Sequence, residues 1–170
     1  MSLLPVVRRT WAPRGQTPVL VHRFGWKRIS LAAMVAYPSC GTGRPRLLFH
    51  ALDGAYNEDV LMDVIEQLRC SVRGAKVTLV WDRLTGHRSH RMRAFLARQR
   101  HWLVAELLPS YGHELNPVEG VWGNLKSVDF ANVCCDSTTE LHETAHAGMR
   151  RIRSTPRLLA AFLRRTGLGL

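Results

Sequence analysis

The sequence predicts an α/β fold in which helices flank a mixed β-sheet. Short apolar runs rich in β-branched residues alternate with longer segments whose apolar residues recur three and four positions apart, which is typical of strands alternating with helices. The length of 170 residues is enough for one domain with a substantial core. No internal repeat or linker-like stretch divides the chain. We therefore expect residues 1–170 to form a single domain.

Two strands are expected in the first third of the chain. Residues 26–37 are apolar without a breaker, and residues 46–52 form a second apolar run. The segment 38–45 between them is rich in Gly and Pro, which favours a turn, so the three segments predict a β-hairpin. Residues 1–25 show no clear periodicity and are expected to be irregular.

A helix and a buried strand are expected next. Asn57 is a good N-cap, two acidic residues behind it suit the helix dipole, and Gly74 suits the C-terminal end. Residues 76–81 are a continuous apolar run that predicts a strand buried on both faces, as in a parallel sheet. In open α/β sheets ligands bind beyond the carboxyl ends of the strands, and Asp82 follows this strand directly.

The second half of the chain is predicted to hold one strand and four helices, most with recognisable caps. In chain order these elements are a helix over 90–99 after Ser89, a strand over 102–108, a helix starting at Asn116–Pro117, a helix behind the capping box Ser137–Glu140, and a last helix from Pro156 that stops at Gly167.

The charge of the chain points to a polyanionic partner. Lys and Arg number 24 against 13 Asp and Glu, which gives a net charge of +11, and 21 of the basic residues are Arg. Residues 1–52 contain eight basic residues and no acidic one. Arginine suits bidentate phosphate contacts, so nucleic acid is the first candidate for the partner. A GC-rich genome would also favour Arg, and this alternative stays open.

Several protein classes are excluded by composition. No apolar run approaches the roughly 18 residues that span a bilayer, and the N-terminus has no signal-peptide pattern. The four cysteines form no CxxC pair, so a disulfide scaffold is not expected, and an intracellular chain is. His142 and His146 with Cys134–Cys135 could bind Zn²⁺, but adjacent cysteines make a poor structural site.

Two carboxylates stand where a metal site is expected. Asp82 follows a strand, and Glu119 lies in the first turn of a helix, on one face with Gly123 and Lys126. Hard oxygen donors from two elements can share a Mg²⁺ ion, and such ions assist phosphodiester cleavage. Glu119 could instead be only a capping residue and Asp82 only a turn residue.

The two stretches resemble a known family. Residues 108–126 resemble the signature of the DDE superfamily of transposase endonucleases, in its mariner-like bacterial insertion-sequence branch. The matching residues are Pro109, Tyr111, Leu115, Asn116, Pro117, Val118, Glu119, Trp122 and Lys126. Asp82 and His87 match the family's strand-end motif, and 36 residues lie between Asp82 and Glu119, as is usual in the family. Residues 8–18 resemble the segment behind the family's first catalytic strand.

The resemblance implies an RNase H-like fold and divalent-metal-dependent cutting and joining of DNA at transposon ends and target. It assigns Asp82 and Glu119 as catalytic and metal-binding residues for Mg²⁺ or Mn²⁺. The expected DNA contacts are His87, Arg88, Arg91, Arg93 and Lys126. A homo-oligomer and a cytoplasmic, nucleoid-associated location are also expected, with no membrane partner.

The sequence departs from the family in its first part. The family's first Asp lies on a strand before the segment of Trp11, and no Asp or Glu precedes Trp11 in this chain. That carboxylate, its strand and the N-terminal helix-turn-helix region therefore fall upstream of Met1, and a central strand position is expected to be empty. His113 and Arg83 replace a common Pro and a common Asn.

These departures leave competing functions open. The first is a transposase catalytic domain with impaired cleavage, from a truncated gene, a frameshifted pair or a misplaced start codon. The second is a relic that binds DNA or a full-length transposase without catalysis. Another RNase H-fold nuclease, such as a resolvase or integrase, is a third, which the signature around Asn116 and Glu119 disfavours.

Overall fold

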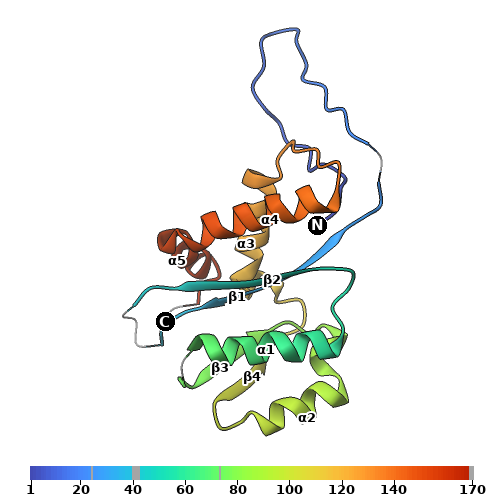
Figure 1. The fold of residues 1–170 in the computed structure, drawn as a ribbon. Coiled ribbons are helices and arrows are strands. Elements are labelled where there is room, and N and C mark those ends of the chain that lie inside the picture. Colours follow the sequence, from blue (N-terminus) through green and yellow to red (C-terminus); the bar gives the residue numbers. More distant parts are fainter. Residues whose placement is uncertain (24, 40–42, 73, 169–170) are drawn as a thin grey trace.

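The computed structural model describes residues 1–23, 25–39, 43–72 and 74–168, and this part has the expected α/β composition (Figure 1). The strands are β1 (Ile29–Ala36), β2 (Arg46–Asp53), β3 (Val77–Trp81) and β4 (Leu103–Leu107). The helices are α1 (Glu58–Val72), α2 (His90–Arg98), α3 (Val118–Asn124), α4 (Thr138–Arg153) and α5 (Pro156–Arg165), with 3₁₀ turns at Thr85–Arg88 and His113–Leu115 and a π-helical turn at Leu125–Asp129. The elements lie within a few residues of their expected positions, which confirms the fold class.

The strands pair in two small sheets. β1 and β2 are antiparallel over their full lengths, whereas β3 and β4 are parallel and end together, with Trp81 opposite Leu107. Both strand directions of a mixed sheet are thus present. Among the described strands, however, none lies between β1 and β3 to hydrogen-bond with both, so the two pairs remain separate.

The apolar side chains form two hydrophobic cores, and the β1–β2 hairpin packs against both of them. The larger core lies between the β1–β2 hairpin and α3–α5, and its fully buried members include Ile29, Leu47, Val121, Leu125, Leu141, Met149, Ile152 and Leu159. The smaller core joins α1, α2, β3 and β4 through Ile65, Leu68, Met92, Phe95, Trp102 and Leu103. Figure 1 shows the same division, with α3–α5 and α1–α2 on opposite sides of the hairpin.

β3 is buried on one face only. Val77, Leu79 and Trp81 pack against the smaller core, but Val80 is 50% exposed. The neighbouring Val104 of β4 is also 50% exposed. The expectation of a strand buried on both faces is therefore wrong, because the helices that pack on this sheet cover only one side of it.

The helix caps lie where the sequence predicts them. Side-chain oxygens of Asn57, Ser89 and Ser137 each accept a hydrogen bond from the backbone N–H three residues later, at 2.9, 3.0 and 3.1 Å. The Glu140 carboxylate completes its capping box by accepting from the backbone N–H of Asp136 rather than from that of Ser137. These bonds satisfy N–H groups that a helix start leaves unpaired.

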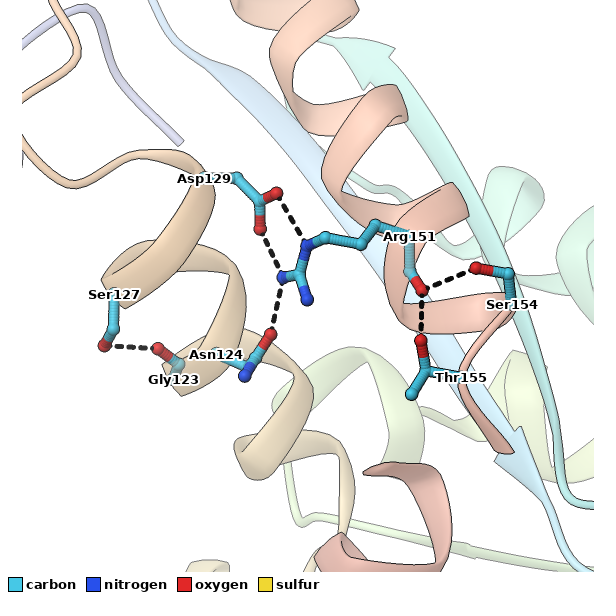
Figure 2. A network of polar contacts seen from close by, with 7 residues as sticks. All are labelled: Gly123, Asn124, Ser127, Asp129, Arg151, Ser154 and Thr155. Atoms are coloured by element: carbon cyan, nitrogen blue, oxygen red, sulfur yellow. Dashed lines mark hydrogen bonds and ion pairs between the residues drawn. The ribbon is translucent and has the colours of Figure 1, made fainter. Parts of the chain in front are cut away.

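The end of the π-helical turn is fastened to α4 (Figure 2). The Arg151 guanidinium donates to both carboxylate oxygens of Asp129, at 3.0 and 2.7 Å, and to Oδ1 of Asn124 at 2.6 Å. Gly148 brings the two segments into contact, since a Cβ there would lie 2.4 Å from Cδ1 of Leu125. Bidentate pairing and close packing together fix this junction.

The N-terminal segment leaves the body as a long loop. Residues 7–23, which we call the arm, contain no helix or strand, and Figure 1 shows them extending away from the helices. Before the arm, Met1 and Leu3 pair with Ile29 and Lys27 beside the start of β1. Residues 1–25 were expected to be irregular, and their described part contains no helix or strand, only isolated bridges at Ser2 and Val6.

Other findings concern the thiols and the membrane. Cys70, Cys134 and Cys135 are free thiols. Cys40 and the centre of the turn expected over 38–45 lie outside the described residues. In the described part of the chain, no helix is both long and apolar enough to cross a membrane.

Candidate functional site

The carboxyl ends of β3 and β4 meet at one edge of the parallel sheet. The backbone N–H of Leu108, one residue beyond β4, donates to the carbonyl of Trp81, the last residue of β3, at 2.8 Å. Nε of Arg83 donates to the carbonyl of Leu108 at 2.8 Å. These two bonds join the turn that bears Asp82 to the loop that leads from β4 to α3.

Asp82 is held in place by its own turn. Its Oδ1 accepts from the backbone N–H of Leu84 at 3.0 Å and lies 2.8 Å from Nδ1 of His87. The imidazole stacks on the indole of Trp81, with ring centroids 4.1 Å apart and planes within 6°. Because Oδ1 makes both polar contacts, the other carboxylate oxygen of Asp82 has no protein partner among the described residues and is available to a ligand.

His87 is more buried than the carboxylate that it contacts. Its side chain is 13% exposed, whereas that of Asp82 is 42% exposed. When Nδ1 donates to the carboxylate, Nε2 of the neutral ring is left as an acceptor. His87 therefore orients Asp82 and is less accessible to a large ligand than the sequence suggests for a DNA contact.

Glu119 lies on the exposed face at the start of α3. The side-chain oxygen of Asn116 accepts from the backbone N–H of Val118 at 3.2 Å, and the Asn116 carbonyl accepts from Glu119 at 3.0 Å. Asn116 thus satisfies two N–H groups at the start of α3, but the helix begins at Val118 and its N-cap position is Pro117 rather than Asn116 as expected. Within the described part of the chain, the Glu119 carboxylate has no hydrogen bond or ion pair.

Two glycines of α3 differ in their surroundings. A Cβ at Gly120 would lie 2.5 Å from the ring of Phe162, so this glycine lets α3 pack directly on α5. A Cβ at Gly123 would meet nothing within 4 Å, which leaves open space on the face of Glu119. One glycine therefore sets the position of the helix, and the other leaves room beside its carboxylate.

The loop before α3 contains a strained residue. Tyr111 has φ +63° and is 95% exposed. A left-handed conformation is unfavourable for a bulky residue, and such strain is concentrated at functional sites. Tyr111 therefore joins the candidate site as an exposed aromatic ring on the loop between β4 and Glu119.

The expected basic contacts have different environments. Arg91 on α2 is engaged in an ion pair with Asp59 of α1, Nη2 to Oδ1 at 2.5 Å, and this partner strengthens its charged state, so the pKa of Arg91 is raised. Arg88 and Arg93 are exposed and have no such partner within the described residues. Lys126 is exposed in the π-helical turn that follows α3.

The histidines of the zinc alternative are used elsewhere. Nε2 of His142 lies 3.0 Å from Oδ1 of Asp53, and the ring of His146 packs edge-on against Phe49 at 5.2 Å. No group of three or more His, Cys, Asp or Glu residues that could hold a metal occurs among the residues that the structure describes. The zinc alternative gains no support from this arrangement.

Two features of the site have no signal in the sequence. The stacking of His87 on Trp81 joins residues six positions apart through a turn that no pattern specifies. The ion pair of Arg151 and Asp129 joins α4 to the π-helical turn that follows α3, and the two residues are 22 positions apart. The sequence shows an aromatic residue, Trp81, directly before Asp82, but it does not indicate that this residue stacks on His87.

Three comparisons relate the chain to known proteins. A family model described as DDE superfamily endonuclease matches residues 1–141. The solved structure of the Mos1 transposase catalytic domain with Raltegravir and Mg is similar to this chain at 13% sequence identity, with 84% of each chain covered and a TM-score of 0.42. A search of curated proteins finds no match.

Proposed function

Because the chain belongs to the DDE superfamily of endonucleases, we propose that it is the catalytic part of a DNA transposase with an RNase H-like fold. In this proposal Asp82 and Glu119 are the carboxylates that act in divalent-metal-dependent cleavage and joining of DNA strands. The partner is double-stranded DNA, at transposon ends and target.

One observation supports the site above all. Asp82 follows β3, and the loop to Glu119 follows β4, at the shared carboxyl edge where Leu108 is bonded to Trp81 and Arg83. The family match covers both carboxylates. Ligands of open α/β sheets bind at such an edge, which supports a site that includes Asp82 and that the loop leading to Glu119 adjoins.

The donors suit a magnesium ion. Asp82 has one carboxylate oxygen without a protein partner among the described residues, and Glu119 has two. Mg²⁺ prefers oxygen ligands, takes few carboxylates from the protein and keeps several waters. When bound by Asp82 and Glu119, it would supply an activated water and charge stabilisation at the scissile phosphate.

The neighbouring side chains have distinct roles in this proposal. His87 orients the Asp82 carboxylate through the 2.8 Å contact to Oδ1. Lys126 lies seven residues after Glu119, in the π-helical turn that follows α3, and would bind a DNA phosphate. The open space at Gly123 leaves room for the DNA strand between them.

The proposal includes impaired cleavage. The resemblance requires a third carboxylate, and the chain has no acidic residue before Asp53. Asp53 lies at the end of β2 and its carboxylate contacts His142 on α4. Asp53 is thus already engaged with a helix of the larger core, which makes it a poor substitute for the missing ligand.

Metal binding is testable without any activity. Mn²⁺ bound to the 170-residue chain is measured by electron paramagnetic resonance for the wild type, Asp82→Asn, Glu119→Gln and the control Glu143→Gln, an exposed carboxylate on α4. Each site variant should weaken Mn²⁺ binding at least tenfold, and the control should bind like the wild type. Equal binding by all four proteins would overturn the metal assignment.

Cleavage of a labelled duplex in Mg²⁺ tests the rest. The 170-residue chain should be nearly inactive, and fusion to a segment that supplies the family's first Asp should restore cleavage, which Asp82→Asn or Glu119→Gln should then abolish. Robust cleavage by the unfused chain would contradict the impairment. Duplex binding without cleavage in every form would favour the second candidate, a DNA-binding protein without catalysis.

A further inference from the structure

The arm is exposed along nearly its whole length. Trp11 is 100% exposed, and Val7, Val19 and Val21 are each more than 70% exposed. Apolar side chains of this size in solvent indicate an interaction site when they gather on one segment. The arm therefore has the character of a binding element rather than of a packed loop.

Both ends of the arm are anchored to the body. The start of the arm is hydrogen-bonded to Asn132. The backbone N–H of Asn132 donates to the Val6 carbonyl at 2.9 Å, and its Oδ1 accepts from the backbone N–H of Arg8 at 2.8 Å. Asn132 adopts φ +59°, which asparagine tolerates better than most residues. Beyond its end, Arg28 lies beside Ser2 in the short pairing next to β1. The arm thus projects from a fixed base.

The charge of the arm has one sign. It carries Arg8, Arg9, Arg14 and Arg23 and no acidic residue, and the acid-free region continues to residue 52. Exposed arginines with interspersed aromatic and aliphatic side chains suit phosphate contacts, with apolar contacts to sugars or bases. The partner that matches this chemistry is a polyanion with apolar surfaces between its charges.

The base of the arm converges on the helix of Glu119. Arg28 and Lys126 line one pocket of about 270 Å³ together with residues 1, 2, 4 and 6. The Met1 ammonium in this pocket has a lowered pKa, chiefly because of burial and then because of the positive charges of Lys126 and Arg28. Lys126 in turn lies in the π-helical turn that directly follows the helix of Glu119, seven residues further along the chain.

We propose that the arm binds the backbone of duplex DNA beside the site of Glu119, so that one positive track runs from Lys126 through Arg28 to the arm. The inference rests on the proposed function, because it takes DNA to be the partner. It adds a binding element that the motifs around Asp82 and Glu119 do not contain. The arm would hold the DNA that leaves the site.

The test is a salt titration of duplex binding by the full 170-residue chain. Binding of a labelled 25-base-pair duplex is measured by fluorescence anisotropy for the wild type, for Arg9→Ala/Arg14→Ala/Arg23→Ala, and for Arg157→Ala/Arg164→Ala/Arg165→Ala on α5. Both variants lose three charges. Only the arm variant should lower the slope of log K against log salt, by about 2.7 if all three contacts are lost, and raise Kd at least tenfold.

The outcomes separate the two proposals. Equal losses in the arm variant and the α5 variant would overturn the arm proposal while leaving DNA binding intact. A flat slope for the wild type would overturn both. The alternative partner of the arm is a second copy of the chain, which light scattering tests. If the arm variant changes the molecular mass of the protein but not the salt slope, the arm binds a second copy and the proposal is wrong.

Discussion

The helical layer α3–α5 and the arm are opposite extremes of one chain. In the layer, Gly120 and Gly148 bring helices so close that a Cβ at either position would overlap a neighbour, and Arg151 fastens Asp129 with two bonds. In the arm, Trp11 is completely exposed. Packing thus fixes Glu119 and Lys126, whereas the arm is fixed only at its ends. Changes in the layer should alter stability, and changes in the arm should alter binding alone.

The largest expected effect is that of Gly148→Ala. The new Cβ would lie 2.4 Å from Cδ1 of Leu125 and 2.6 Å from Cγ of Asp129. Asp129 cannot move away without breaking its contact with Arg151. Alanine would favour the helix by about 1 kcal/mol, but overpacking of this kind costs about 1–3 kcal/mol or more. We expect a net loss of about 1–2 kcal/mol in the free energy of unfolding, measured by urea denaturation.

The matched control is Gly123→Ala in α3. A Cβ there meets nothing within 4 Å, so only helix propensity acts and stability should rise by about 0.5–1 kcal/mol. Opposite signs for the two substitutions would support the close junction between the π-helical turn and α4. If Gly148→Ala also stabilised the protein, Gly148 would have to lie further from Leu125 and Asp129 than it does in the structure.

A smaller effect is expected where the hairpin meets α5. The Tyr37 hydroxyl donates to the Leu159 carbonyl at 2.9 Å, and burial raises the pKa of Tyr37 from 10.0 to about 12. The fold therefore favours the neutral phenol. This contribution is present below pH 10 and is lost as the pH rises from 10 to about 12, because the unfolded chain then releases the proton first.

Comparison of the wild type with Tyr37→Phe isolates this contribution. At pH 8 the variant should be less stable by about 1 kcal/mol, the usual net value of a lost hydrogen bond. Toward pH 12 the difference should shrink, as seen in urea unfolding at several pH values. A difference that stays constant from pH 8 to pH 12 would contradict the role of the phenol. Tyr111→Phe, at an exposed ring, should leave stability at pH 8 unchanged.

Local sequence signals predicted the secondary-structure elements of the chain. Local signals were sufficient for the elements: Asn57, Ser89 and Ser137 cap the helices that were expected to start there. The strand-end position of Asp82 and the first-turn position of Glu119 followed from the same signals. Helix and strand periods are local properties, so residues close in sequence determine them.

Long-range packing left no comparable signal. The run over 76–81 is apolar throughout, and that pattern does not distinguish a strand covered on both faces from one covered on a single face, such as β3. The separation of the strands into two sheets depends on which strands are available to pair, not on any one strand. The contacts of Gly148 with Asp129, and of Asn132 with the base of the arm, equally depend on the folded arrangement.

The smallest expected effect on stability is that of a substitution in the arm. Trp11→Ala removes the largest side chain of the arm, yet its ring is fully exposed and buries no apolar surface in the isolated chain. Substitutions of this kind usually change stability by less than about 0.5 kcal/mol. The urea midpoint should therefore match that of the wild type, whereas Gly148→Ala, measured under the same conditions, should shift it clearly. Addition of duplex DNA should reveal a difference between Trp11→Ala and the wild type that is absent without it, because the ring becomes useful only when a partner covers it. If Trp11→Ala lowered the free energy of unfolding by more than about 1 kcal/mol without DNA, the arm would have to pack on the rest of the protein and would not be free to bind a ligand.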